Sequence, residues 1–110
     1  MRVGAVIDDL MFYSRIDAAA SASGATLVRA SSPSDLPADL DLVLVDWSAR
    51  QPSWADAIHT ASALARVILF GPHTDLVAHA SARAAGLGPM WGRSKLVAEL
   101  PALMAAPTVT

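Results

Sequence analysis

Two apolar runs in this 110-residue chain end on aspartates, whose carboxylates can bind cations or act as nucleophiles. Residues 3–7 lead into Asp8 and Asp9, and residues 42–45 lead into Asp46. Three carboxylates held close together repel one another unless a cation lies between them. Hard oxygen ligands on a partly open site suit Mg²⁺, which keeps several waters and takes only a few carboxylates. The aspartates therefore predict a magnesium site, provided that the fold brings the two runs together.

The order of the apolar segments indicates how those runs are placed. Continuous apolar runs are typical of strands covered on both faces, and apolar residues three or four apart are typical of helices. We expect strands at residues 3–7, 25–30, 42–45, 67–70 and 89–91. We expect helices at residues 11–23, 53–65 and 74–85, a last helix capped by Ser94, and a loop with at most one helical turn at 31–40. Pro101 predicts a kink or a late start in the last helix.

Strands that alternate with helices imply an α/β fold, in which a parallel sheet lies between two layers of helices. Five such strands fit a three-layer, doubly wound, flavodoxin-like sheet with strand order 2-1-3-4-5. Ligands of such sheets lie outside the carboxyl ends of the strands, where the strand order reverses. That point falls between the first and third strands, which are the two that end at Asp8, Asp9 and Asp46. The third helix is expected to turn inward the side chains of Leu76, Val77, Ala80 and Ala84.

In order and spacing, the whole chain resembles the receiver (CheY-like) domains of bacterial response regulators. VIDD resembles the family's acidic pair after the first strand, and DLVLVD resembles the strand that carries its phospho-accepting aspartate. Residues 83–86, at the end of the third helix expected here, resemble the alanine-glycine end of the family's fourth helix. The resemblance implies that Asp8 and Asp9 bind Mg²⁺ together with Asp46 and the backbone carbonyl of Ser48. It also implies that Asp46 accepts a phosphoryl group.

Three positions depart from the pattern of that family. The family has Thr or Ser at the end of the fourth strand, where this chain has Gly71. Its aromatic position on the fifth strand corresponds to Met90. Its lysine corresponds to Arg93 or to Lys95, depending on the glycine from which the spacing is counted. The metal-binding residues are therefore retained, whereas the residues that switch and transmit the signal are replaced.

Other roles are open for the same residues. Asp8 or Asp9 can cap the first helix and leave the other carboxylate in solvent, because aspartate is favoured at helix N-termini. Arg93 can be the partner of the aspartates or a surface charge. Trp91 can be a packing residue or part of a partner surface.

Composition limits the classes of partner. The net charge of −2, with 16% charged residues, provides no basic face for nucleic acid. No apolar run is long enough to predict a membrane span, and the absence of cysteine fits a cytoplasmic protein.

We therefore expect one receiver-like domain at residues 1–106, with a tail at 107–110. As a stand-alone module it would signal by protein–protein contact through residues 74–105, and a homodimer is possible. Any catalysis would be limited to autophosphotransfer onto Asp46. One alternative is a conventional receiver that takes phosphate on Asp46 from a histidine kinase with Mg²⁺. Another is a flavodoxin-like protein that binds a small anion with Arg93.

Overall fold

A computed structural model describes residues 1–105 of the chain. The predicted domain boundary at residue 106 and the predicted tail at 107–110 lie outside the described residues. Among the helices that are described, none is both long and apolar enough to cross a membrane.

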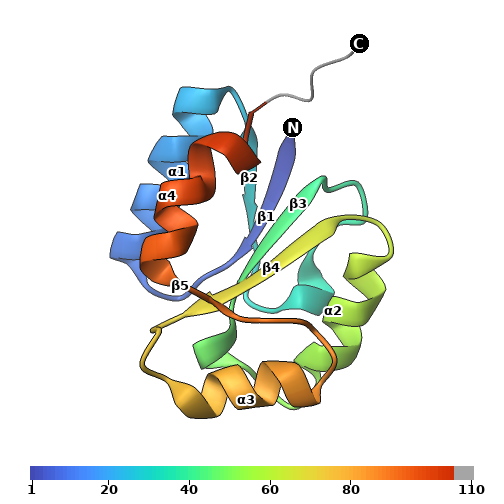
Figure 1. Ribbon diagram of the computed structural model, residues 1–110. Coiled ribbons are helices and arrows are strands. Elements are labelled where there is room, and N and C mark those ends of the chain that lie inside the picture. Colours follow the sequence, from blue (N-terminus) through green and yellow to red (C-terminus); the bar gives the residue numbers. More distant parts are fainter. Residues whose placement is uncertain (106–110) are drawn as a thin grey trace.

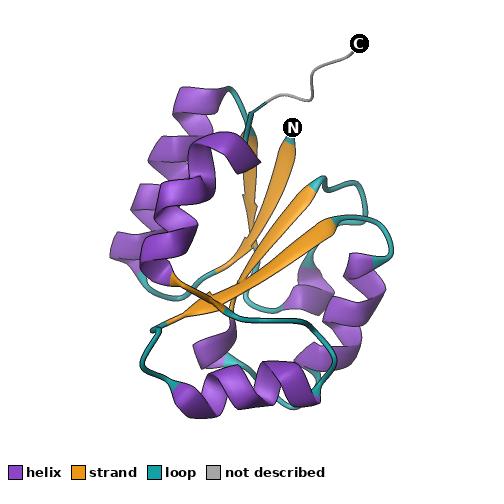
Figure 2. Ribbon diagram, viewed as in Figure 1, coloured by secondary structure: helices purple, strands orange, loops and turns teal. Residues whose placement is uncertain are grey.

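The sheet has the predicted parallel order, β2-β1-β3-β4-β5, which confirms the flavodoxin-like topology (Figures 1 and 2). Its strands are β1 (Arg2–Val6), β2 (Thr26–Arg29), β3 (Leu42–Asp46), β4 (Arg66–Gly71) and β5 (Trp91–Gly92). The helices are α1 (Leu10–Ser23), α2 (Trp54–Ser62), α3 (Leu76–Ala84) and α4 (Arg93–Leu103), with 3-10 turns η1 (Pro33–Asp35) and η2 (Trp47–Ala49). The crossover from β2 to β3 holds only η1, as the sequence predicts.

The sheet separates two apolar cores, one under α1 and α4 and one under α2 and α3 (Figure 1). Side chains of β3 alternate between the two cores: Leu42 and Leu44 face the first, and Val43 and Val45 face the second. All four are almost completely buried. Because successive residues of a strand point to opposite faces, a strand that is covered on both faces needs apolar residues throughout. This explains the continuous apolar run before Asp46.

The inward face of α3 differs from the predicted one. Ala78 and Ala82 are buried in the second core, whereas Leu76 and Val77 are 74% and 71% exposed. Asp75 is the N-cap of the helix, and its carboxylate accepts the N–H of Ala78, so Leu76 and Val77 are the first two helical residues. The two buried alanines therefore form the inner face of α3, and the expected inner face of Leu76, Val77, Ala80 and Ala84 is wrong.

The fifth strand and the start of α4 also lie slightly away from their predicted places. β5 comprises only Trp91 and Gly92, and the buried Met90 precedes it. Gly92 occupies the N-cap position of α4 and no side chain caps this helix, so the predicted cap at Ser94 is wrong. The helix includes Pro101 and begins at Arg93, so the late start that was one of the two expectations does not occur.

Candidate functional site

Parallel pairing brings the carboxyl ends of β1 and β3 together. Val6 of β1 lies opposite Val45 of β3, so the chain leaves both strands at the same edge of the sheet. Asp46 is the last residue of β3, and Asp9 follows β1 as the N-cap of α1. This edge also carries the first residue of α4, Arg93, because Gly92 pairs with the end of β4.

Asp9 has the capping role that the sequence left open. Its Oδ1 accepts the backbone N–H of Met11 at 3.0 Å and that of Phe12 at 3.1 Å. These bonds satisfy two of the N–H groups that a helix start leaves without a partner. The neighbouring Asp8 is exposed and makes no hydrogen bond or ion pair with another described residue. The predicted pair of metal ligands is therefore divided between a helix cap and a solvated carboxylate.

Asp46 is the only charged side chain that is buried within residues 1–105. Its Oδ1 accepts the backbone N–H of Ser48 at 3.1 Å and also the hydroxyl of Ser48. A buried carboxylate is costly unless it is hydrogen-bonded and paired with a positive charge. Ser48 provides these hydrogen bonds, one from its backbone N–H and one from its side-chain O–H.

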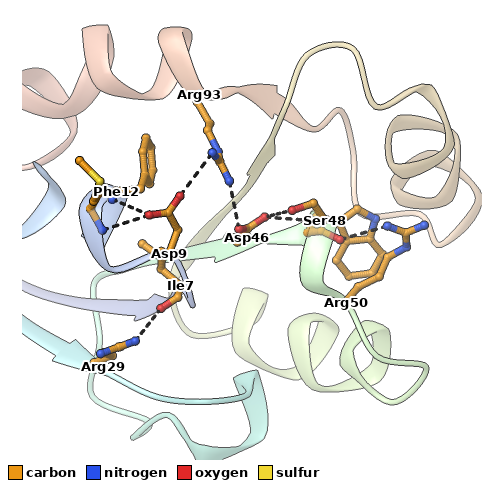
Figure 3. A network of polar contacts seen from close by, with 10 residues as sticks. Ile7, Asp9, Phe12, Arg29, Asp46, Ser48, Arg50 and Arg93 are labelled. Atoms are coloured by element: carbon orange, nitrogen blue, oxygen red, sulfur yellow. Dashed lines mark hydrogen bonds and ion pairs between the residues drawn. The ribbon is translucent and has the colours of Figure 1, made fainter. Parts of the chain in front are cut away.

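Arg93 supplies the positive charge and joins the two strand ends (Figure 3). Its guanidinium lies 3.7 Å from Oδ2 of Asp9 and 3.6 Å from Oδ2 of Asp46. These distances are those of ion pairs and are longer than hydrogen bonds. The guanidinium carbon also lies 5.3 Å from the centre of the Phe12 ring, within the range of a cation–π contact. Lys95 lies elsewhere, with its Nζ 4.4 Å from the centre of the Trp91 ring, so Arg93 is the basic residue of the site.

The oxygen atoms at this site do not fit a divalent cation in the observed arrangement. Within the described part of the chain, no three His, Cys, Asp or Glu side chains are grouped in a way that could hold a metal ion. Oδ1 of Asp9 and Oδ1 of Asp46 are engaged in hydrogen bonds, and both Oδ2 atoms face Arg93. The magnesium set of Asp8, Asp9, Asp46 and Ser48 remains a prediction.

Gly71 and Met90 are in contact, although the sequence presents them as two separate departures. A Cβ atom on Gly71 would lie 3.2 Å from Sδ and 3.3 Å from Cε of Met90, and 3.6 Å from Cβ of Ser48. Met90 is 4% exposed, so its thioether fills the space that a Thr or Ser side chain at residue 71 would need. No pattern in the sequence reveals this contact, because it depends on how the chain enters β5.

The comparisons with known proteins show likeness only at the level of structure. The sequence matches no family model and no curated protein. A response regulator protein from Burkholderia multivorans has 23% sequence identity, with 99% of this chain and 98% of that chain covered and a TM-score of 0.68. A response regulator receiver protein from Burkholderia phymatum has 19% identity, 98% coverage of both chains and a TM-score of 0.60. The receiver domain of a Clostridium thermocellum response regulator has 16% identity, coverage of 94% and 93%, and a TM-score of 0.61. This chain has the receiver fold.

A groove between α1 and α4 opens beside the acidic edge of this receiver fold. It encloses about 670 Å³ and is lined by Asp9, Arg15, Arg93 and Ser94, together with the apolar residues Met11, Phe12, Val97 and Ala98. Met11 is 83% exposed on the α1 side of this groove, and no motif in the sequence indicates the groove.

Proposed function

We propose that this receiver-fold domain acts in signal transduction by contact with a protein partner, and that its contact surface is held in one state without phosphate. The observation that carries the proposal is the packing of Met90 against Gly71. In the family that the sequence resembles, a hydroxyl on the fourth strand and an aromatic ring on the fifth respond to the phosphoryl group. Gly71 offers no hydroxyl, and Met90 has no ring.

The physical reason concerns the contacts that differ between two states. A ligand shifts a two-state equilibrium only by as much as its interactions differ between those states. A phosphoryl group on Asp46 would find no side chain at residue 71 to draw inward. Met90 is already buried in the space beside Gly71, so its position does not depend on the phosphoryl group. The surface that follows from β5 should therefore stay as it is.

We propose the surface of residues 74–105 as the contact with the partner. Leu76 and Val77 are two exposed apolar side chains at the start of α3. Trp91, which is partly buried, lies at the edge of the sheet beneath the Nζ of Lys95. Exposed apolar side chains that adjoin on a surface, as those of Leu76 and Val77 do, are typical of interaction sites. A second copy of this chain could occupy the same surface.

A small-anion-binding protein is the second candidate, and the groove between α1 and α4 favours it. Arg15, Arg93 and the hydroxyl of Ser94 line this groove, and the uncapped start of α4 lies there too. The pairing of Arg93 with two carboxylates weakens this candidate, because the carboxylates already neutralise its charge.

The proposed function is tested by incubation with acetyl phosphate and Mg²⁺, followed by mass spectrometry and amide hydrogen exchange. We expect the exchange of residues 74–105 to be the same before and after treatment, even in molecules that carry phosphate. An Asp46→Asn variant is the control for phosphorylation elsewhere. If exchange across α3 and α4 becomes slower or faster only in the phosphorylated protein, the domain is a conventional receiver that phosphorylation switches.

A further inference from the structure

We infer that Arg93 is a built-in counter-ion that stands in the place of a divalent cation, so that the acidic site keeps its structure without Mg²⁺. The inference deepens the proposed function, on which its meaning for signalling rests. The inference about Arg93 is based on the contacts of Arg93 with Asp9 and Asp46, whereas the proposed function is based on the contact of Gly71 with Met90.

The guanidinium of Arg93 lies where a shared cation would have to lie. A cation shared by the ends of β1 and β3 would have to lie between a carboxylate from each strand. Two different nitrogens of Arg93 lie there, one 3.7 Å from Asp9 and the other 3.6 Å from Asp46. They face the two Oδ2 atoms, which are the oxygens left over by the helix cap and by Ser48. The planar guanidinium has donors on both sides and is always charged, so it can serve two carboxylates at once.

The guanidinium of Arg93 is also held in place by its surroundings. Pairing of Gly92 with Gly71 sets the position of the backbone from which Arg93 projects. The Phe12 ring contacts the guanidinium, and the side chain of Arg93 is only 37% exposed. The side chain of Asp46 is 6% exposed, so solvent screens its attraction to Arg93 much less than it screens a surface ion pair.

Arg93 and a divalent cation exclude each other at this site. Mg²⁺ binds its ligands at roughly 2.0–2.1 Å and would need the same Oδ2 atoms that face the guanidinium. The cation would also be repelled by the positive charge of Arg93. Binding of Mg²⁺ at millimolar concentration therefore requires Arg93 to leave, and the buried Asp46 opposes that departure.

The test compares thermal melting of the wild type, Arg93→Gln and Arg15→Gln, each in EDTA and in millimolar Mg²⁺, with NaCl matched for ionic strength. Arg15 is the control because it lines the same groove but pairs with no carboxylate among residues 1–105. We expect Mg²⁺ to leave the melting temperatures of the wild type and of Arg15→Gln unchanged. We expect Arg93→Gln to melt lower in EDTA and to gain several degrees with Mg²⁺, because its two carboxylates then lack a cation.

Either of two results overturns the inference: a wild-type protein that Mg²⁺ stabilises beyond the salt control, or an Arg93→Gln variant that does not gain from Mg²⁺. If Arg93→Gln does not fold, Mn²⁺ titration of the wild type by NMR decides. Broadening of amide signals at residues 46–48 overturns the inference, and unbroadened signals support it. A wild-type response to the metal would leave the proposed function standing, since that depends on residues 74–105.

Discussion

The thioether of Met90 lies against the backbone of Gly71, with Sδ 3.2 Å from the place where a Cβ on residue 71 would be. Gly71 is the last residue of β4 and Met90 directly precedes β5, so the contact lies where these two neighbouring strands meet. A side chain at residue 71 would displace Met90, and a smaller side chain at residue 90 would leave a void beside Gly71. The two residues thus form one compensating pair.

Gly71→Thr should be destabilising because it forces the Met90 side chain out of its buried position. Overpacking of this kind costs about 1–3 kcal/mol. Met90→Ala should also destabilise, since it leaves a void beside Gly71. The double variant should lose less than the sum of the two, and urea denaturation measures all three. Strictly additive losses would mean that the two side chains do not compete for one space.

Asp9→Ala should lower the free energy of unfolding by about 1 kcal/mol, because α1 loses its N-cap. Asp9→Asn should lose less, since the amide oxygen can still accept the N–H groups of Met11 and Phe12. Asp8→Ala is the matched control and should change little, because Asp8 is exposed and without polar contacts in the described structure. Chemical denaturation measures both variants. Equal losses of unfolding free energy in Asp8→Ala and Asp9→Ala would argue against the cap.

Ser48→Ala should destabilise by roughly 1–2 kcal/mol, because the buried carboxylate of Asp46 loses the hydroxyl that donates to it. The backbone N–H of residue 48 remains and limits the loss. Ser94→Ala is the control, as Ser94 is exposed and does not cap α4. Thermal melting that separates the two serine variants by less than the measurement error would contradict this account of Asp46.

Leu76→Ser and Val77→Ser should leave the stability within about 0.5 kcal/mol of the wild type, because both side chains project from α3 into solvent. Ala78→Leu should destabilise by about 1–3 kcal/mol, because Ala78 is completely buried. If residues 74–105 form a homodimer, the serine variants should also weaken self-association in sedimentation experiments. A large loss of stability in Leu76→Ser would return α3 to the orientation predicted from the sequence.

Patterns that repeat along the chain made the fold predictable. The continuous apolar run of β3 and the alternation of strands with helices lead to the observed sheet order, and the position of Asp46 follows from it. The orientation of α3 was not predictable, because alanines occur on several of its faces and apolar spacing alone cannot choose between them. In the structure the buried pair is Ala78 and Ala82, and Asp75 caps the helix before them.

The details of the site depend on the path of the chain through residues 86–92. Spacing alone could not choose between Arg93 and Lys95, since the two lie two residues apart at the start of one helix. The structure separates them: Arg93 contacts the aspartates, and Lys95 contacts Trp91. The contact between Gly71 and Met90 had no signal in the sequence either, because it joins residues that are distant along the chain.

The most direct test of a surface held in one state is an amide NMR comparison with and without beryllofluoride and Mg²⁺, which together mimic a phosphoryl group. We expect shifts near Asp46 at most, with the signals of α3, β5 and α4 unchanged, because Gly71 has no hydroxyl and Met90 no ring to respond to the mimic. Large shifts that spread from Asp46 through residues 74–105 would contradict the account.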